Sequence, residues 1–161
     1  MFLEGFVRMH SHLFTMAFGI GIVAGLRSFT APAAVGWGAY LGKLNLRNLF
    51  ISSGVVVGLL SLLAVSEYIA DLLPKTPNRT APWPLLVRII TGGFSGALIC
   101  LSANQSVVVG ASLGGIGGII GAFAGYNARK RLVEGLKVKD AVIAIPEDLI
   151  AIGLGYLIAI G

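Results

Sequence analysis

Apolar residues dominate six stretches of the chain, and most charged residues lie at the edges of these stretches. The stretches are 11–27, 30–44, 50–73, 84–103, 106–128 and 140–160. The last four hold 20 to 24 residues, close to the ~20 that cross a bilayer core as a helix. The pattern predicts an all-α, multi-pass integral membrane protein that forms one membrane domain over residues 1–161.

The first two stretches are harder to separate. Residues 13–42 form one run of 30 residues that Arg27 and Pro32 interrupt, and a single helix of that length would measure about 45 Å. Hydroxyl residues followed by proline are typical of a helix start, so we expect a break near Ser28. Two arrangements fit: six spanning helices, or five with residues 30–44 lying as an interfacial or re-entrant helix.

Two short similarities point to an internal repeat. Residues 64–67 (Ala-Val-Ser-Glu) resemble residues 144–147 (Ala-Ile-Pro-Glu), and residues 35–40 resemble residues 120–126 in their glycine and aromatic positions. Each similarity joins one of the first three stretches to one of the last three. The chain therefore predicts two repeats of three helices each.

The two predicted half-repeats are 1–73 and 84–161, joined by the proline-rich loop 74–84. Three helices per half place the two halves in opposite orientations in the membrane. Inverted repeats of this kind are the usual architecture of small secondary transporters.

The composition agrees with a membrane environment, because 56% of the residues are apolar, 12% are charged and mean hydropathy is +0.89. These values exclude a soluble enzyme and a disordered chain, and one cysteine excludes a disulfide scaffold. The net charge is +5, but the basic residues lie in loops without interleaved aromatic residues. We therefore expect membrane lipids as partners and no nucleic acid.

The basic residues also predict an orientation. Nine lie on one predicted side of the membrane and three on the other in both arrangements, and the richer side is expected to be cytoplasmic. In the six-helix arrangement the nine are Arg27, Lys75, Arg79, Arg88, Arg129, Lys130, Arg131, Lys137 and Lys139. The loops 74–84 and 129–140 are then cytoplasmic, in a bacterial inner membrane.

Four acidic residues lie inside apolar stretches: Glu67, Asp71, Glu147 and Asp148. An ionised group at membrane depth costs several kcal/mol unless it is paired or hydrated, so each is a candidate functional residue. Glu67 and Asp71 are four residues apart and share one helix face. The two glutamates lie at similar distances from the predicted ends of their helices, so we expect them to share one layer.

Two arginines complete this predicted substrate- or ion-binding cluster. Gly92 and Gly96 continue the helix face of Arg88, which therefore points into a packed seam. Arg27 ends the first stretch, and only the six-helix arrangement brings it into the same layer as the acids. Because buried charges need partners, this favours six helices. The alternative is that the acids merely neutralise Arg27 and Arg88 and fix the positions of the helices.

Two prolines are predicted to interrupt helices. Pro32 follows the expected break, and Pro146 lies inside the sixth stretch, directly before Glu147. A proline within a helix leaves the carbonyl one turn before it, here that of Val142, without its helical hydrogen bond. In a membrane such a carbonyl is tolerated only beside protein or a water-filled cavity.

Glycines recur at intervals of four residues, a spacing that lets helix backbones approach closely in a membrane. The expected packing positions are Gly21, Gly25, Gly92, Gly96, Gly117, Gly121 and Gly125. The alternative role for such a seam is a homo-oligomeric surface.

The stretches contain no nucleophile–base set, so we expect no enzymatic activity. His10 and His12 have no further ligand nearby in the sequence, so we expect neither a metal site nor a cofactor.

The order of several motifs resembles a known family. These are Gly25-Leu26-Arg27 before a proline-containing break, Glu67-Tyr68-Ile69-Ala70-Asp71 followed by Pro74, Arg88 with a glycine-alanine step behind it, and Pro146-Glu147-Asp148. Together they resemble the bacterial membrane proteins catalogued as domain of unknown function 4126, over most of the chain except residues 129–140. The resemblance implies the membrane fold and this choice of residues, but no activity.

The sequence thus predicts a small membrane transporter or channel-like carrier whose acid–arginine cluster binds a proton, a cation or a small charged solute. The alternative is a non-transporting scaffold or assembly partner with structural ion pairs.

Overall fold

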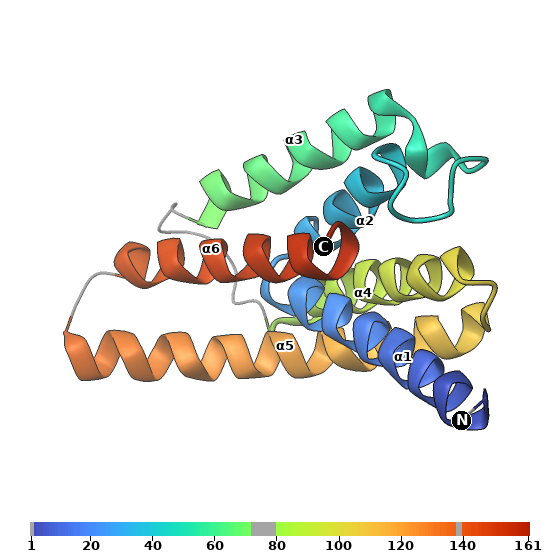
Figure 1. Cartoon of the computed structure of the whole chain (residues 1–161). Coiled ribbons are helices and arrows are strands. Elements are labelled where there is room, and N and C mark those ends of the chain that lie inside the picture. The colour runs from blue at the N-terminus through green and yellow to red at the C-terminus, as the bar shows by residue number, and fades with distance from the viewer. Residues whose placement is uncertain (1, 72–79, 138–139) are drawn as a thin grey trace.

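The computed structural model describes residues 2–71, 80–137 and 140–161, and the regular structure in these residues is entirely helical. Figure 1 shows the six α-helices and one short 3-10 turn, η1. Their bounds are α1 Phe2–Leu26, α2 Thr30–Tyr40, η1 Phe50–Ser52, α3 Gly54–Asp71, α4 Pro82–Ser102, α5 Val107–Leu136 and α6 Asp140–Ala159. The predicted all-α fold is confirmed for the described residues.

Among the described residues, four helices are long and apolar enough to cross a membrane: α3, α4, α5 and the Val142–Ala159 part of α6. The apolar part of α1, Ser11–Leu26, is shorter. The 11 residues of α2 measure about 16 Å, about half of a ~30 Å bilayer core. The chain is therefore a multi-pass α-helical membrane protein in which α2 is too short to cross the bilayer.

Several predicted boundaries differ from the structure, and the largest difference at a helix start is that α1 begins at Phe2 rather than near residue 11. The second helix ends at Tyr40 rather than near residue 44, and α3 begins at Gly54 after η1. The predicted loop 129–140 is wrong for its first eight residues, because α5 continues to Leu136. Arginine, lysine, leucine and glutamate favour helix, so this polar segment remains helical although its hydropathy falls. Of the proline-rich loop 74–84, residues 74–79 lie outside the described part, and α4 already begins at Pro82.

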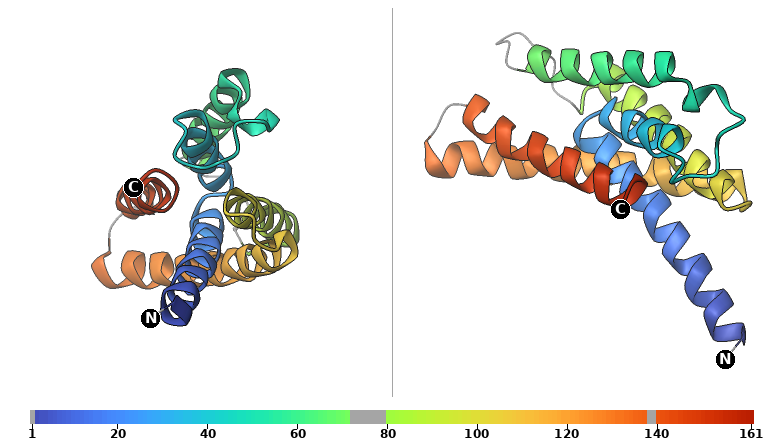
Figure 2. Two further views of the ribbon diagram at one scale, coloured as in Figure 1. Left: turned by 45° about the vertical axis from the view of Figure 1, so that its right-hand side comes forward. Right: turned by 45° about the horizontal axis from the view of Figure 1, so that its top comes forward.

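Successive helices run in alternating directions, and the N-terminal part of α1 extends away from the others (Figures 1 and 2). The core of the molecule is formed by α1, α4 and α5, which pack against one another along most of their shared length. Alternating directions are a property of any chain of connected spans, so they leave the inverted repeat a prediction.

Glycines make the contacts in this three-helix core. A Cβ atom added to Gly21 would lie 2.2 Å from the carbonyl oxygen of Gly114, and one added to Gly25 would lie 2.5 Å from that of Gly118. A Cβ atom added to Gly92, Gly96, Gly117 or Gly121 would likewise lie 2.4 to 2.6 Å from a backbone oxygen of a neighbouring helix. Gly125 is buried on the same helix, α5. At all seven positions that the four-residue spacing marked, the glycine is buried.

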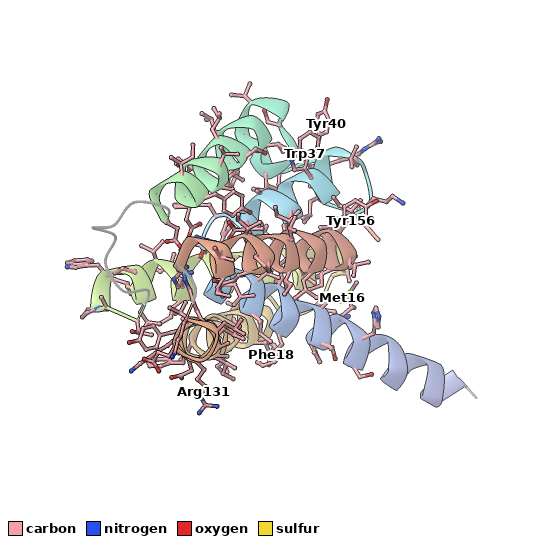
Figure 3. The ribbon with its side chains drawn as sticks, turned by 90° about the vertical axis from the view of Figure 1, so that its left-hand side faces the viewer. Met16, Phe18, Trp37, Tyr40, Arg131 and Tyr156 are labelled. Atoms are coloured by element: carbon pink, nitrogen blue, oxygen red, sulfur yellow. The ribbon has the colours of Figure 1, made fainter. Side chains whose placement is uncertain are left out.

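The other three helices are held differently. The short α2 contacts α3, α4 and α6, whereas α3 packs chiefly on α2 and η1. Only Val57 and Ala64 are buried on α3. The indole nitrogen of Trp37 on α2 donates a hydrogen bond of 3.1 Å to Ser61 on α3, and Figure 3 shows Trp37 and Tyr40 together at the outer end of α2. Apolar packing therefore fixes α3 only weakly.

We expect a Gly114→Ala substitution to destabilise the protein by about 1–3 kcal/mol or more, because overpacking forces the backbones apart. The new Cβ would lie 2.1 Å from the carbonyl oxygen of Gly92. Thermal unfolding in detergent micelles measures the effect. Gly58→Ala is the matched control, since a Cβ there has no atom within 4 Å. An equal loss of Tm in both variants would contradict the role of the glycine seam.

Candidate functional site

The chain breaks between α1 and α2, and the break is buried. Arg27 and Ser28 separate Leu26, the last residue of α1, from Phe29, which precedes α2. Backbone groups at helix ends have no partners within the helix, and in a membrane water cannot supply them. Side chains from two other helices bind these backbone groups.

Arg88 of α4 binds the end of α1. Its Nη1 donates hydrogen bonds of 2.8 Å to the carbonyl oxygens of both Gly25 and Leu26. A cation at a helix C-terminus also interacts favourably with the helix dipole. The predicted orientation of Arg88, into a packed seam on the face of Gly92, agrees with its side-chain exposure of 6%.

Glu67 of α3 binds the start of α2. The backbone N–H groups of Ser28 and Phe29 donate to Oε1 and Oε2 of Glu67 at 2.8 and 3.0 Å. A carboxylate at a helix N-terminus is the electrostatic counterpart of an arginine at the C-terminus. Nη2 of Arg88 lies 3.5 Å from Oε1 of Glu67, so one ion pair bridges the two sides of the break.

Arg27 lies inside the break and is fully buried, with 0% exposure. Its Nε donates a hydrogen bond of 2.5 Å to Oδ1 of Asp148 on α6, and Nη2 also contacts this oxygen. Its Nη1 lies 2.6 Å from Oδ2 of Asp71 on α3. The guanidinium carbon is 5.4 Å from the ring centroid of Tyr68, a cation–π distance.

Arg129 of α5 joins this cluster, although the sequence pattern predicts it only in a loop. Its Nη1 donates to Oδ2 of Asp71 at 2.9 Å and lies 3.6 Å from Oε2 of Glu147. Asp148, Arg27, Asp71, Arg129 and Glu147 thus form a chain of alternating charges. Because Glu147 and Asp148 are neighbours on α6, the chain closes into a ring.

A signal for Arg129 was present in the sequence. It lies four residues after Gly125 and continues the series of Gly117, Gly121 and Gly125, as Arg88 precedes Gly92 and Gly96. The sequence pattern also did not predict four further residues of the site: Ser28, Phe29, Thr30 and Tyr68. The hydroxyl groups of Thr30 and Tyr68 share a hydrogen bond of 2.6 Å, which adds a second link between α2 and α3.

The structure therefore brings all six predicted cluster residues together and adds Arg129. The charges are divided between two sets of helices. The three arginines lie at the end of α1, on α4 and on α5, which are the glycine-packed helices, and the four acids lie on α3 and α6. The side chains of Glu67, Asp71, Glu147 and Asp148 keep exposures of 12–18%, whereas Arg27 is fully enclosed.

The cluster lies near one end of the bundle. In the antiparallel α4–α5 pair, Gly96 is opposite Gly110, Gly92 is opposite Gly114 and Arg88 is opposite Gly118. Arg88 is six residues from the start of α4 at Pro82, a rise of about 9 Å. Arg129, further along α5, is nearer still to this end. The charges therefore form a layer at one mouth of the membrane domain rather than at its centre.

The two prolines occupy different settings. Pro32 is buried in the first turn of α2, where proline is compatible with a helix start. Pro146 is exposed inside α6, which remains helical from Asp140 to Ala159. The discontinuity beside the charged cluster is thus the α1–α2 break, and α6 is not divided into two helices.

Within the described residues, no group of three or more His, Cys, Asp or Glu side chains is arranged to hold a metal ion. The side chain of His10 lies outside the described part, and that of His12 is exposed. No family model, curated protein or solved structure matches this chain. The class that the fold defines is therefore a multi-pass helical membrane protein with a charged layer around a broken helix.

We expect Arg27→Met to destabilise the protein by about 3–5 kcal/mol, because it removes the arginine that Asp148 contacts and leaves Asp71 with Arg129 alone of its two arginines. The triple variant R27M/D71N/D148N removes the carboxylate charges as well and should recover most of this loss. Unfolding by denaturing detergent measures both free energies. Arg131→Met, at an exposed position on α5, is the control. If the triple variant were no more stable than Arg27→Met, the pairing of Arg27 with these acids would not account for the loss.

Proposed function

We propose that the protein is a small membrane carrier whose charged layer at the α1–α2 break binds a proton, a cation or a small charged solute. Glu67 and Glu147 are the exchanging groups, Asp71 and Asp148 support them, and Arg27 and Arg88 act as counter-ions. Arg129 joins the counter-ions because it contacts both Asp71 and Glu147.

The division of charge between two sets of helices is the observation that carries this proposal. Arginines stay charged in proteins, whereas carboxylates can take up a proton or a cation. Here the arginines belong to the tightly packed helices and the carboxylates to α3 and α6, and the carboxylates keep 12–18% exposure. Binding of a proton or cation to a carboxylate would weaken its ion pair with an arginine. Binding would thereby be coupled to helix movement.

The helix that would move most is α3. It packs chiefly on α2 and η1, and its C-terminal half is tied to the rest by Glu67, Tyr68 and Asp71. Carriers require a part that moves against a fixed part. The glycine-packed α1, α4 and α5 provide the fixed part in this scheme.

The proposed setting is the bacterial inner membrane, with the charged layer at the cytoplasmic mouth and six membrane-inserted helices in two inverted halves. The short α2 would be the inserted but non-spanning member of the first half. The charged layer is then the binding site, and it lies nearer the mouth than the midplane sites that are usual for transporters of this architecture. The resemblance to the membrane family of unknown function supports the choice of residues and adds no activity.

A transport assay tests the proposal. In proteoliposomes with an imposed pH gradient, we expect wild-type protein to dissipate the gradient or drive solute uptake, and the E67Q/E147Q variant to lose at least tenfold in rate. Glu134→Gln is the matched control, because Glu134 is exposed on α5 outside the cluster. Equal rates for wild type and E67Q/E147Q would remove the idea.

The mobility of α3 can be measured separately. In a C100A background we expect spin labels at Ser66 and Ile90, both exposed, to give a broader or longer distance distribution in E67Q/D71N than without these substitutions. Labels at Val55 and Leu101, at the opposite end of the bundle, serve as the control pair and should not change. An unchanged Ser66–Ile90 distribution would show that the acids do not hold α3 in place.

A second candidate is a non-transporting scaffold, in which the same ion pairs only hold the helices together. It is favoured by the fact that each of the four carboxylates contacts an arginine. In that case E67Q/E147Q would lower Tm, and wild-type proteoliposomes would not dissipate the gradient faster than protein-free vesicles.

A further inference from the structure

The C-terminal part of α5 extends past the helix with which it is paired. The register that sets Gly92 opposite Gly114 places Trp83, near the start of α4, opposite Phe123. The helix then continues for 13 residues, to Leu136, which is a rise of about 20 Å. The α5 extension, defined as Ala128–Leu136 with its cap Lys137, therefore reaches beyond the level of Trp83.

Trp83 marks the membrane boundary at this end. Its side chain is 78% exposed, and it lies in the first turn of α4. Tryptophan is enriched at the headgroup level of membrane proteins, where its ring is partly apolar and its N–H is hydrated. The α5 extension lies beside the start of the α6 span at Val142, because its Arg129 contacts Glu147, so it lies at the membrane boundary.

The α5 extension presents two kinds of side chain to this region. Lys130 and Arg131 are exposed and lie about 100° apart around the helix, the exposed Glu134 lies between them, and Lys137 follows as the left-handed cap. Figure 3 shows Arg131 pointing away from the neighbouring helices. Leu132 and Leu136 lie on a separate arc and are 45% and 61% exposed. The surface therefore carries three basic residues and Glu134 on one side and two leucines on the other.

We propose that the α5 extension binds the phosphate groups of anionic phospholipids in the leaflet at this end. Lysine and arginine near a membrane surface each contribute about fivefold to the attraction of anionic lipid, and the two leucines can contact the upper acyl chains. A nucleic acid is disfavoured because such a ligand would not explain exposed leucines at the headgroup level. The inference does not depend on transport.

The two tryptophans of the chain, Trp37 and Trp83, allow a direct test. The W37F variant leaves Trp83 as the reporter, in mixed vesicles where either phosphatidylglycerol or phosphatidylcholine carries bromine, which quenches fluorescence. We expect Trp83 to be quenched more strongly by brominated phosphatidylglycerol, with a relative association constant of about five or more at low salt. In the W37F/K130Q/R131Q/K137Q variant this constant should fall to about one.

Matched controls come from the opposite end of the bundle. The substitution pair K43Q/R47Q removes exposed basic residues there and should leave the preference at Trp83 unchanged. The inference is overturned if Trp83 shows no preference for phosphatidylglycerol, if the preference survives K130Q/R131Q/K137Q, or if K43Q/R47Q abolishes it equally. Binding of a labelled oligonucleotide by W37F protein in neutral vesicles, lost in K130Q/R131Q/K137Q, would assign the surface to nucleic acid instead.

Discussion

The structure depends on how the backbone groups at the break of an interrupted helix find hydrogen-bond partners in an environment without water. Two carbonyl oxygens at the end of α1 and two N–H groups before α2 face the interior, and Arg88 and Glu67 bind them. Each unsatisfied group of this kind would cost several kcal/mol in hydrocarbon. The ion pair between Arg88 and Glu67 is therefore also a pair of helix caps, which explains why these charges lie within the helical bundle.

The remaining charges link α3 and α6 to Arg27 and α3 to α5. Asp71 and Asp148 approach Arg27 from α3 and α6, and Arg129 reaches Asp71 from α5. The glycine-packed helices, in contrast, touch through their backbones, which leaves no side-chain freedom to be lost or rearranged. Close packing thus holds α1, α4 and α5, whereas the charges hold the C-terminal half of α3 and the Glu147–Asp148 part of α6, whose other end packs closely on Gly38 of α2.

Much of this arrangement follows from patterns in the sequence. Apolar length predicted the helices, and the rule that buried charges need partners placed Arg27 with the acids, as the contact with Asp71 and Asp148 shows. Hydropathy could not find the last turns of α5, because helix formation there depends on propensity and not on burial. It also could not show that Glu67 caps α2, since this requires knowledge of where the backbone groups of Ser28 and Phe29 point.

The small size of α2 has a consequence for the membrane around it. With 11 residues against 21 in α4, it is about 15 Å shorter than its neighbour, and the loop after it carries Lys43 and Arg47, both exposed. Polar groups at that depth draw headgroups and water inward and thin the bilayer locally. A transmembrane voltage would then drop over a shorter distance at the Lys43 end of α2 than elsewhere around the protein, at the opposite end of this helix from Arg27.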